Sequence, residues 1–366
     1  MPRRIVCLAV ALACLLAAGP AFAAARRPTG TTTPPVLAPP PLPAAWVLVD
    51  ADSGAVVDAG NAHTSVPVAS IFKVLTALVA VQHLRPGDPV PVSAHAAGMP
   101  ARNINLKQGQ LWRFDDLLHA LLIVSANDAA VAIAEKVGGD LAGFDRLMAA
   151  TAKHLGLADH PVLLDPAGLD DEFSYEGGNR ISARDMAIVT RAALADPQIA
   201  TAVAEPVYRF DGGDGNPHRL LNHNLMLTSY LGAIGVKTGY TRRAGHSLIA
   251  AARRNGRTMI AVVIRAADPY RSAAGLLDRG FATPVAAEAR LDHLPAVVLA
   301  RAVVPVPSPA TTPRRHTHVA ARPVSSSSTT SALVPIVVLV FGGGPAIAIL
   351  TLRRRRQRAR VLRWSV

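Results

Sequence analysis

A serine and a lysine three residues apart could form a nucleophile–base pair within the apolar run VASIFKVLTAL. Ser70 and Lys73 share one face of the helix that the periodicity predicts over residues 68–84. A lysine that is desolvated beside a hydroxyl binds its proton less tightly and can remove the serine proton. The alternative is structural, with Ser70 as a helix N-cap and Lys73 extending its ammonium to water.

Two further short motifs carry groups that suit acyl transfer. Ser125 and Asn127 lie at the junction of two helices predicted within residues 114–139, where a hydroxyl could relay a proton and a carboxamide could hold a substrate amide. Lys237, Thr238 and Gly239 follow an apolar strand and offer a charge, a hydroxyl and an open edge that a ligand can approach. Each motif alone also fits a structural role: a helix cap, with Asp128 as the alternative capping group, and a strand entering a turn.

The three motifs together favour chemistry over these structural roles. S-x-x-K, S-x-N and K-T-G occur in this order on helix, junction and strand, which is the signature of penicillin-binding proteins and class A β-lactamases. Lysine is scarce, with five lysines among 38 basic residues, and two of the five occupy the lysine positions of the signature. The pattern therefore indicates that Lys73 is the base that activates Ser70.

Residues 44–285 resemble the D-alanyl-D-alanine carboxypeptidases of low-molecular-mass penicillin-binding type, peptidase family S11. The resemblance includes SANDAAVAIAE, DPAGLD, ARDMAIVTRAAL, VKTGYT and LLDRGF. It implies an α+β, β-lactamase/transpeptidase-like fold, in which helices flank an antiparallel sheet and form a further helical subregion. It also implies removal of the terminal D-alanine from peptidoglycan stem pentapeptides through an acyl-enzyme, acylation by β-lactam antibiotics, and no cofactor or metal.

The resemblance also assigns roles to individual residues. Ser70 would be the nucleophile, Lys73 its general base, and Ser125 an aid to proton transfer. The oxyanion hole would consist of the backbone N–H groups of Ser70 and Tyr240. The residues implied to bind the substrate are Asn127, Lys237, Thr238, Gly239, Tyr240 and Arg271, with Arg265 as a nearby alternative to Arg271.

The elements that must position these residues follow from periodicity and turn residues. Alternation on both sides of Asp52-Ser53-Gly54 predicts a hairpin near the start of the domain, and three strands are predicted near its end. The sheet is therefore expected to be antiparallel and built from both ends of the domain, with helices against it. The predicted strands cover 44–61, 232–241, 246–256 and 257–267, with turns after Gly239 and at Asn255-Gly256; the helices cover 68–84, two segments within 114–139, 144–157, 181–196 and 272–282.

The positive net charge does not belong to the predicted folded domain. The chain has a formal net charge of +13, but residues 44–304 contain 24 Lys plus Arg against 25 Asp plus Glu. The excess arginines lie in the flanking segments, so the composition gives no support to nucleic-acid binding. Both cysteines, Cys7 and Cys14, lie in a predicted signal peptide, so the mature domain is expected to have no disulfide.

Composition divides the chain into six predicted segments. They are a signal peptide (1–24), a Pro/Thr-rich linker (25–43), a serine DD-peptidase domain (44–304), a Pro/Ser/Thr-rich linker (305–331), a transmembrane segment (332–352) and a basic cytoplasmic tail (353–366). This order predicts a single-pass protein of the cell membrane with an extracytoplasmic catalytic domain and a cytoplasmic C-terminus. Many relatives carry a further β-rich domain, which this sequence is not expected to contain.

Two other functions compete with the carboxypeptidase. A β-lactamase needs a deacylating glutamate, and Glu172, Glu176 and Glu205 lie in the right interval but lack the E-x-x-L-N context. A non-catalytic, membrane-tethered peptidoglycan-binding protein would be expected to have lost a motif residue, and none is lost.

The twelve histidines show no metal-ligand spacing. Two acidic groups, Asp115-Asp116 and Asp170-Asp171-Glu172, are interpreted as solvated.

Overall fold

The computed structural model describes residues 41–100, 102–170 and 178–297. The predicted segments 1–24, 305–331, 332–352 and 353–366 lie outside these residues, as do Glu172 and Glu176. Within the described ranges, no helix combines the length and the apolar character that a membrane span requires.

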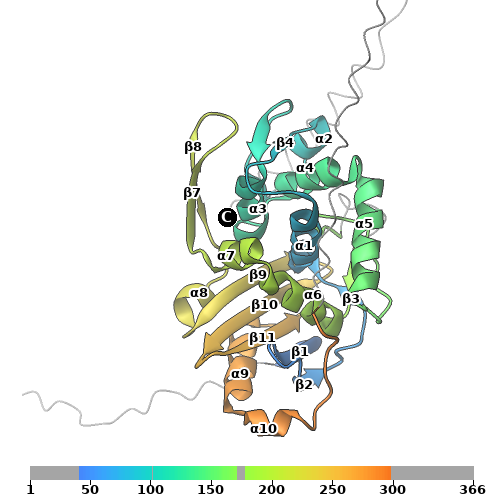
Figure 1. Cartoon of the computed structure of the whole chain (residues 1–366), viewed down its shortest axis with the longest axis vertical. Coiled ribbons are helices and arrows are strands. Elements are labelled where there is room, and N and C mark those ends of the chain that lie inside the picture. Colours follow the sequence, from blue (N-terminus) through green and yellow to red (C-terminus); the bar gives the residue numbers. More distant parts are fainter. Residues whose placement is uncertain (1–40, 101, 171–177, 298–366) are drawn as a thin grey trace, which may run out of the picture. The chain divides into compact units, whose positions relative to one another are not determined.

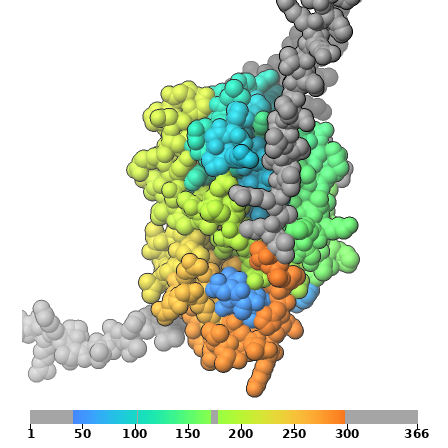
Figure 2. Space-filling view, viewed as in Figure 1, coloured from blue at the N-terminus to red at the C-terminus, as the bar shows by residue number. Residues whose placement is uncertain are grey.

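The centre of the fold is a five-stranded antiparallel sheet in the order β2-β1-β11-β10-β9 (Figure 1). The first strand pairs with the last, from Ala45 opposite Ile264 to Asp50 opposite Met259. Figure 2 shows the same junction at the surface, where the blue N-terminal residues lie among orange C-terminal ones. The predicted sheet built from both ends of the domain is confirmed, with strands β1 Ala45–Asp50, β2 Val56–Gly60, β9 Ala233–Thr241, β10 Gly245–Arg254 and β11 Arg257–Ile264.

The two faces of the sheet bury different sets of side chains, because residues along a strand alternate between faces. Leu248, Ala250 and Ala261 pack against the last long helix, α9 (Pro269–Ala282). Their neighbours Ile249 and Ile260 face the main helical core on the other side. Figure 1 shows α9 on one side of the sheet and α1, α3, α4 and α6 on the other.

The helical region surrounds one almost fully buried helix. This helix, α1, buries every residue from Lys73 to Ala80, and the 3₁₀ turn η1 that precedes it carries Ser70. All the predicted helices are confirmed in position. The helices are η1 Ala69–Phe72, α1 Lys73–His83, α2 Ala94–Ala97, α3 Phe114–Ile123, α4 Asn127–Gly138, α5 Leu141–His154, α6 Ala183–Ala195, α7 Pro197–Ala204, α8 Met226–Ser229, α9 and α10 Val285–Glu288.

Several short elements were not predicted. A hairpin of β7 and β8 packs its aromatic rings against α3, with Tyr208 stacked on His119 at 3.7 Å between ring centroids. Two-stranded pairs β3–β6 and β4–β5 are only two or three residues long, too short for a periodic pattern. The unpredicted strands are β3 Val66–Pro67, β4 Pro89–Pro91, β5 Leu111–Arg113, β6 Arg180–Ile181, β7 Val207–Asp211 and β8 Pro217–Leu221.

Three sequence-based details are wrong. Strand β9 does not turn after Gly239 but continues to Thr241, which pairs with Gly245. Asp116 is not solvated, because it is buried and accepts a hydrogen bond from the Tyr208 hydroxyl at 2.8 Å. Asp170 is also buried, and accepts a hydrogen bond from the Thr241 hydroxyl at 2.6 Å. In both cases a distant part of the chain covers the carboxylate, which local sequence does not report.

Candidate active site

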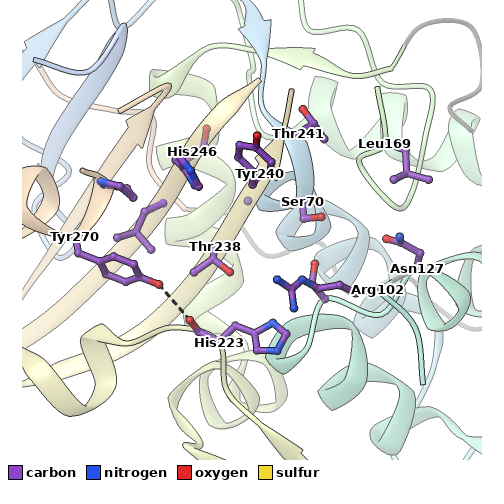
Figure 3. Close-up of a pocket in the computed structure, with 15 residues that line it drawn as sticks. Ser70, Arg102, Asn127, Leu169, His223, Thr238, Tyr240, Thr241, His246 and Tyr270 are labelled. Atoms are coloured by element: carbon purple, nitrogen blue, oxygen red, sulfur yellow. Dashed lines mark hydrogen bonds between the residues drawn. The ribbon is translucent and has the colours of Figure 1, made fainter. Parts of the chain in front are cut away.

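A cavity of about 440 Å³ lies where η1, the α3–α4 junction and strand β9 meet (Figure 3). This volume falls in the range of small-molecule sites. These three segments, which are far apart in the sequence, all contribute residues to its lining. Six residues predicted for the site line it: Ser70, Ser125, Asn127, Thr238, Gly239 and Tyr240.

Lys73 lies beneath the cavity and forms hydrogen bonds with a residue of each of the first two motifs, S-x-x-K and S-x-N. Its side chain is completely buried, and Nζ lies 3.1 Å from Ser70 Oγ and 2.8 Å from Asn127 Oδ1. Its third hydrogen bond goes to the Ala167 carbonyl. An ammonium has three donors, so the protonated side chain is fully satisfied by these partners. After loss of one proton, the nitrogen lone pair has the Ser70 hydroxyl within reach as a donor.

The environment of Lys73 prepares it to act as a base near neutral pH. Burial lowers the pKa of Lys73 to about 7, although the negative charges of Asp165 and Asp128 act in the opposite direction. Desolvation disfavours the charged form of an amine, whereas nearby carboxylates favour it. A general base is most effective when its pKa lies near the working pH. The structural alternative of a lysine extending to water does not apply, because this side chain has no exposed surface.

The Ala167 carbonyl, which accepts a hydrogen bond from Lys73, belongs to a loop in the DPAG segment that several hydrogen bonds hold in place. Asp165 Oδ1 accepts the N–H of Ala167 at 2.6 Å, and the Thr76 hydroxyl donates to the Pro166 carbonyl at 2.7 Å. The Asn179 side chain accepts the N–H of Asp165 and donates to its carbonyl. These bonds fix the Ala167 carbonyl in front of Lys73.

Two non-glycine residues at the site adopt left-handed backbone conformations. Ala69 has φ of +55° directly before Ser70, and Ser125 has φ of +64°. Such conformations are uncommon for residues with a Cβ, and cluster at functional sites when the surrounding structure enforces them. Here they mark the two serines of the signature. Ser125 turns the chain between α3 and α4.

Asn127 holds both the lysine and a neighbouring loop. Its Oδ1 accepts from Lys73, and its Nδ2 donates to the Pro100 carbonyl at 3.1 Å. Its backbone N–H donates to the Arg102 carbonyl at 2.7 Å. The next residue, Asp128, is not the N-cap of α4, a position that Ala126 occupies. The Asp128 carboxylate accepts the N–H groups of Ile104 and Leu106, so the start of α4 anchors residues 104–106.

Strand β9 approaches the nucleophile so closely that only glycine fits at position 239. A Cβ built there would lie 2.9 Å from the N atom of Ile71 and 3.1 Å from that of Ser70. The next residue, Tyr240, lines the cavity and is 58% exposed. This contact brings the backbone at Tyr240 alongside the start of η1, as the implied oxyanion hole requires.

Lys237 does not face the cavity directly. It is 1% exposed and donates to the carbonyl of Thr238 at 3.0 Å. Burial lowers the pKa of Lys237 well below its usual value, and the positive charges of Lys73 and Arg102 lower it further. The hydroxyl-bearing Thr238 is the part of the K-T-G motif that lines the cavity.

Nine lining residues were not predicted as site residues, and four of them carry large polar side chains: Arg102, His223, His246 and Tyr270. Arg102 and His223 lie on one side, and Tyr270 donates to the His223 carbonyl at 3.1 Å (Figure 3). His246 pairs with Tyr240 across β10 and β9, with ring centroids 4.4 Å apart. Only the β9–β10 pairing could have indicated His246. Arg102 and His223 lie in loops and Tyr270 lies in the first turn of α9, and long-range contacts bring all three to the cavity.

Neither Arg271 nor Glu205 lines the cavity, although Tyr270, the residue before Arg271, does. Arg271 is exposed at the start of α9, where its N–H donates to the capping Asp268, and it is not among the cavity-lining residues. Glu205 lies 3.3 Å from His119 Nε2, near the β7–β8 hairpin, and does not line the cavity. Arg265 does not line the cavity; its guanidinium donates to the Arg243 carbonyl at 2.6 Å, and its backbone N–H donates to the hydroxyl of Ser247, which does line it.

Comparisons with known proteins find one family and several relatives of this sequence. A family model described as D-alanyl-D-alanine carboxypeptidase, peptidase S11, matches residues 37–268. The D-alanyl-D-alanine carboxypeptidase DacB2 of Mycobacterium tuberculosis is 33% identical over 243 residues, which cover 65% of this chain and 81% of that relative. DacF of Bacillus subtilis, named for the same activity, is 34% identical over 230 residues, or 61% of this chain and 57% of the relative.

A solved structure matches the described fold. The crystal structure of an evolved penicillin-binding protein homologue from Mycobacterium tuberculosis gives a TM-score of 0.63 at 32% identity. The match covers 68% of this chain and 95% of that one. The α+β architecture with a transpeptidase-like fold, predicted from the resemblance, is therefore confirmed.

Proposed function

Because the chain belongs to the D-alanyl-D-alanine carboxypeptidase family, peptidase S11, we propose that its cavity removes the terminal D-alanine of peptidoglycan stem pentapeptides through an acyl-enzyme on Ser70. The observation that carries the proposal is the buried Lys73, with Nζ 3.1 Å from Ser70 Oγ and a pKa lowered by burial to about 7. A serine hydroxyl needs such an adjacent base to become a nucleophile at neutral pH.

The acylation step uses Ser70, Ser125 and Tyr240 in the cavity lining and Lys73 beneath it. Lys73 takes the Ser70 proton as Oγ bonds to the carbonyl carbon between the two D-alanines. The N–H groups of Ser70 and Tyr240 donate to the developing oxyanion, a stabilisation worth about 3–4 kcal/mol in comparable sites. When the C–N bond breaks, the leaving amine receives a proton from the Lys73 ammonium, with Ser125 beside the path.

Deacylation reverses the same proton transfers. Water attacks the ester carbonyl of the acyl-enzyme, Lys73 accepts a proton from that water, and Ser70 leaves with a proton returned to Oγ. The products are the shortened peptide and free D-alanine. Thr238 hydrogen-bonds the substrate's terminal carboxylate, while Asn127 contributes its second Nδ2 hydrogen to the amide of the acyl part. Lys237 supports Thr238 through the carbonyl of that residue.

β-Lactam antibiotics are proposed to acylate the same serine. Intact-mass spectrometry of the full-length chain after incubation with benzylpenicillin tests this, alongside Ser70→Ala and the matched control Ser229→Ala, which changes an exposed serine on α8. We expect one stable adduct on the wild type and on Ser229→Ala, and none on Ser70→Ala. Release of D-alanine from a pentapeptide is then measured with the same three proteins.

Other outcomes of this experiment would reassign the protein. Rapid turnover of penicillin without a lasting adduct would indicate a β-lactamase. A folded protein that shows neither adduct nor D-alanine release would indicate a non-catalytic peptidoglycan-binding protein.

We further propose that the catalytic domain lies outside the cytoplasmic membrane and is held there by residues 332–352. The support is the sequence: a predicted signal peptide, 21 consecutive uncharged residues, and a following arginine cluster. In intact cells, a penicillin that cannot cross the membrane should label the chain, and the label should remain in the membrane pellet after carbonate extraction. Recovery of the labelled chain in the soluble fraction would contradict the anchor.

A further inference from the structure

The charge of the cavity lining is strongly asymmetric. Among the described residues that line it there is one arginine, Arg102, together with His223 and His246, but no lysine and no carboxylate. The two lysines of the signature lie behind the lining and are almost fully buried. A cavity with this lining favours an anionic ligand group.

Arg102 is held in place through its backbone rather than through its side chain. Its carbonyl accepts the N–H of Asn127 at 2.7 Å, and the following segment is bound to the Asp128 carboxylate. Its guanidinium makes no hydrogen bond or ion pair with any described residue. By contrast, the guanidinium of Arg257 binds two carboxylates. A guanidinium that no protein group occupies retains its five donors for a ligand.

Arg102 is also directed toward the place where the leaving amino acid must lie. Figure 3 draws its side chain pointing into the cavity, toward Thr238 and His223. Its positive charge reaches both Lys237 and His223, since it contributes to lowering the pKa of each side chain. Burial is the largest cause that lowers the pKa of His223, to about 4, so this imidazole is neutral at pH 7 and does not compete as a cation.

We propose that Arg102 binds the C-terminal carboxylate of the substrate and thereby sets the preference of the site for peptides with a free carboxyl end. The inference rests on the proposed carboxypeptidase function and adds to it a residue that the K-T-G signature does not contain. Guanidinium and carboxylate form paired hydrogen bonds of matching geometry, whereas the buried ammonium of Lys237 is directed to the carbonyl of Thr238. Thr238 completes the carboxylate site from strand β9.

The test compares two substrates that give the same acyl-enzyme. One is an N-acylated D-Ala-D-Ala peptide with a free carboxyl end, and the other is its C-terminal methyl ester. The quantity measured is the ratio of kcat/KM for the acid to kcat/KM for the ester. The proteins are the full-length wild type, Arg102→Gln, Arg102→Lys, and the matched control Arg146→Gln, which changes an exposed arginine on α5.

We expect Arg102→Gln to lower the acid-to-ester ratio about 10- to 100-fold, the range for loss of a charge-assisted hydrogen bond. The ester should be cleaved at nearly the wild-type rate, which shows that folding and acylation are intact. Arg102→Lys should retain part of the preference because it keeps the charge but not the paired geometry. Arg146→Gln should not change the ratio.

Three results would overturn the inference. An unchanged ratio in Arg102→Gln would mean that the carboxylate lies elsewhere. An equal loss for acid and ester would mean that Arg102 only supports the loop. A loss of the ratio in Arg271→Gln but not in Arg102→Gln would assign the carboxylate to the arginine implied by the family resemblance. Failure of the carboxypeptidase proposal is separate, because then the wild type cleaves neither substrate.

Discussion

At the level of single residues, the site depends on how Lys73 is compensated. Its ammonium is removed from water, and its three hydrogen bonds and two nearby carboxylates only partly replace hydration. The balance places the pKa of Lys73 close to neutral pH. The charge on Asp165, which lies in the DPAG loop and does not line the cavity, is thus part of how the base is tuned.

Replacement of Asp165 by Asn should shift the pH dependence of penicillin acylation. In the wild type, the acylation rate should rise with pH through a midpoint near 7, because the reactive form of Lys73 is the neutral amine. Asp165 stabilises the protonated form, so its loss lowers the pKa of Lys73 and moves the rising limb to lower pH. Asn keeps the acceptor for the Ala167 N–H. The measurement is the acylation rate as a function of pH.

Thr76→Val separates charge from loop position in this experiment. It removes the hydrogen bond to the Pro166 carbonyl without changing any charge. This variant should lower the acylation rate and leave the midpoint in place. A midpoint at the wild-type pH in Asp165→Asn would show that the carboxylate does not act on Lys73.

The sequence could identify the signature residues but not the residues that surround them. Ser70 and Lys73 are three residues apart along one continuous helical stretch, η1 followed by α1, so their proximity follows from helix geometry alone. No sequence pattern identified Arg102 as a site residue, because its position depends on a loop bound to Asp128, 26 residues later. Contacts of this kind have no periodicity and no local motif.

At the level of elements, the site depends on the contact between β9 and η1. The strand could be predicted from its apolar run, and the helix from its periodicity, but the distance between them could not. Gly239 is the residue that permits this distance, since a Cβ there would meet the N atom of Ile71 at 2.9 Å. The unfavourable backbone of Ala69, directly before η1, was likewise not predictable from an alanine.

Gly239→Ala should therefore lower the acylation rate about 100-fold, because a displacement of about 1 Å at a reacting centre has an effect of this size. The clash is with backbone, so β9 must move away from η1 and take the N–H of Tyr240 with it. Stopped-flow or quenched acylation by penicillin measures the rate.

Gly275→Ala is the matched control. This glycine lies in α9 with nothing within 4 Å of a built Cβ. The substitution should stabilise the helix by up to about 1 kcal/mol and leave acylation unchanged. Acylation of Gly239→Ala at the wild-type rate would show that the strand tolerates a methyl group there.

At the level of the whole molecule, one half-buried arginine joins the two ends of the domain. Arg257 at the start of β11 donates to Asp50 at 2.6 Å on β1 and to Glu288 on α10, and also to two carbonyls after α9. Both carboxylates are only 3% exposed. The strands and the final helices could be predicted from sequence, but this connection could not, because its members are separated by up to 238 positions.

Arg257→Met should lower the free energy of unfolding by about 3–5 kcal/mol, because it leaves two buried carboxylates without a cation. Arg279→Met provides the comparison. Arg279 also pairs with an aspartate, Asp58, but its side chain is 62% exposed, so the expected loss is below about 1 kcal/mol. Urea denaturation followed by circular dichroism measures both. Equal losses would mean that burial does not decide the contribution of these pairs.

The pairing of the first strand, β1, with the last, β11, affects how the chain folds during its synthesis. During synthesis β1 emerges early and has only β2 as a neighbour, while its other partner, β11, follows after every helix from α1 to α8. Closure of so long a loop is entropically costly, and topologies rich in distant contacts fold slowly. Until that closure, the apolar residues of β1 are exposed to other chains, and the period before β11 arrives is when aggregation competes most strongly with folding.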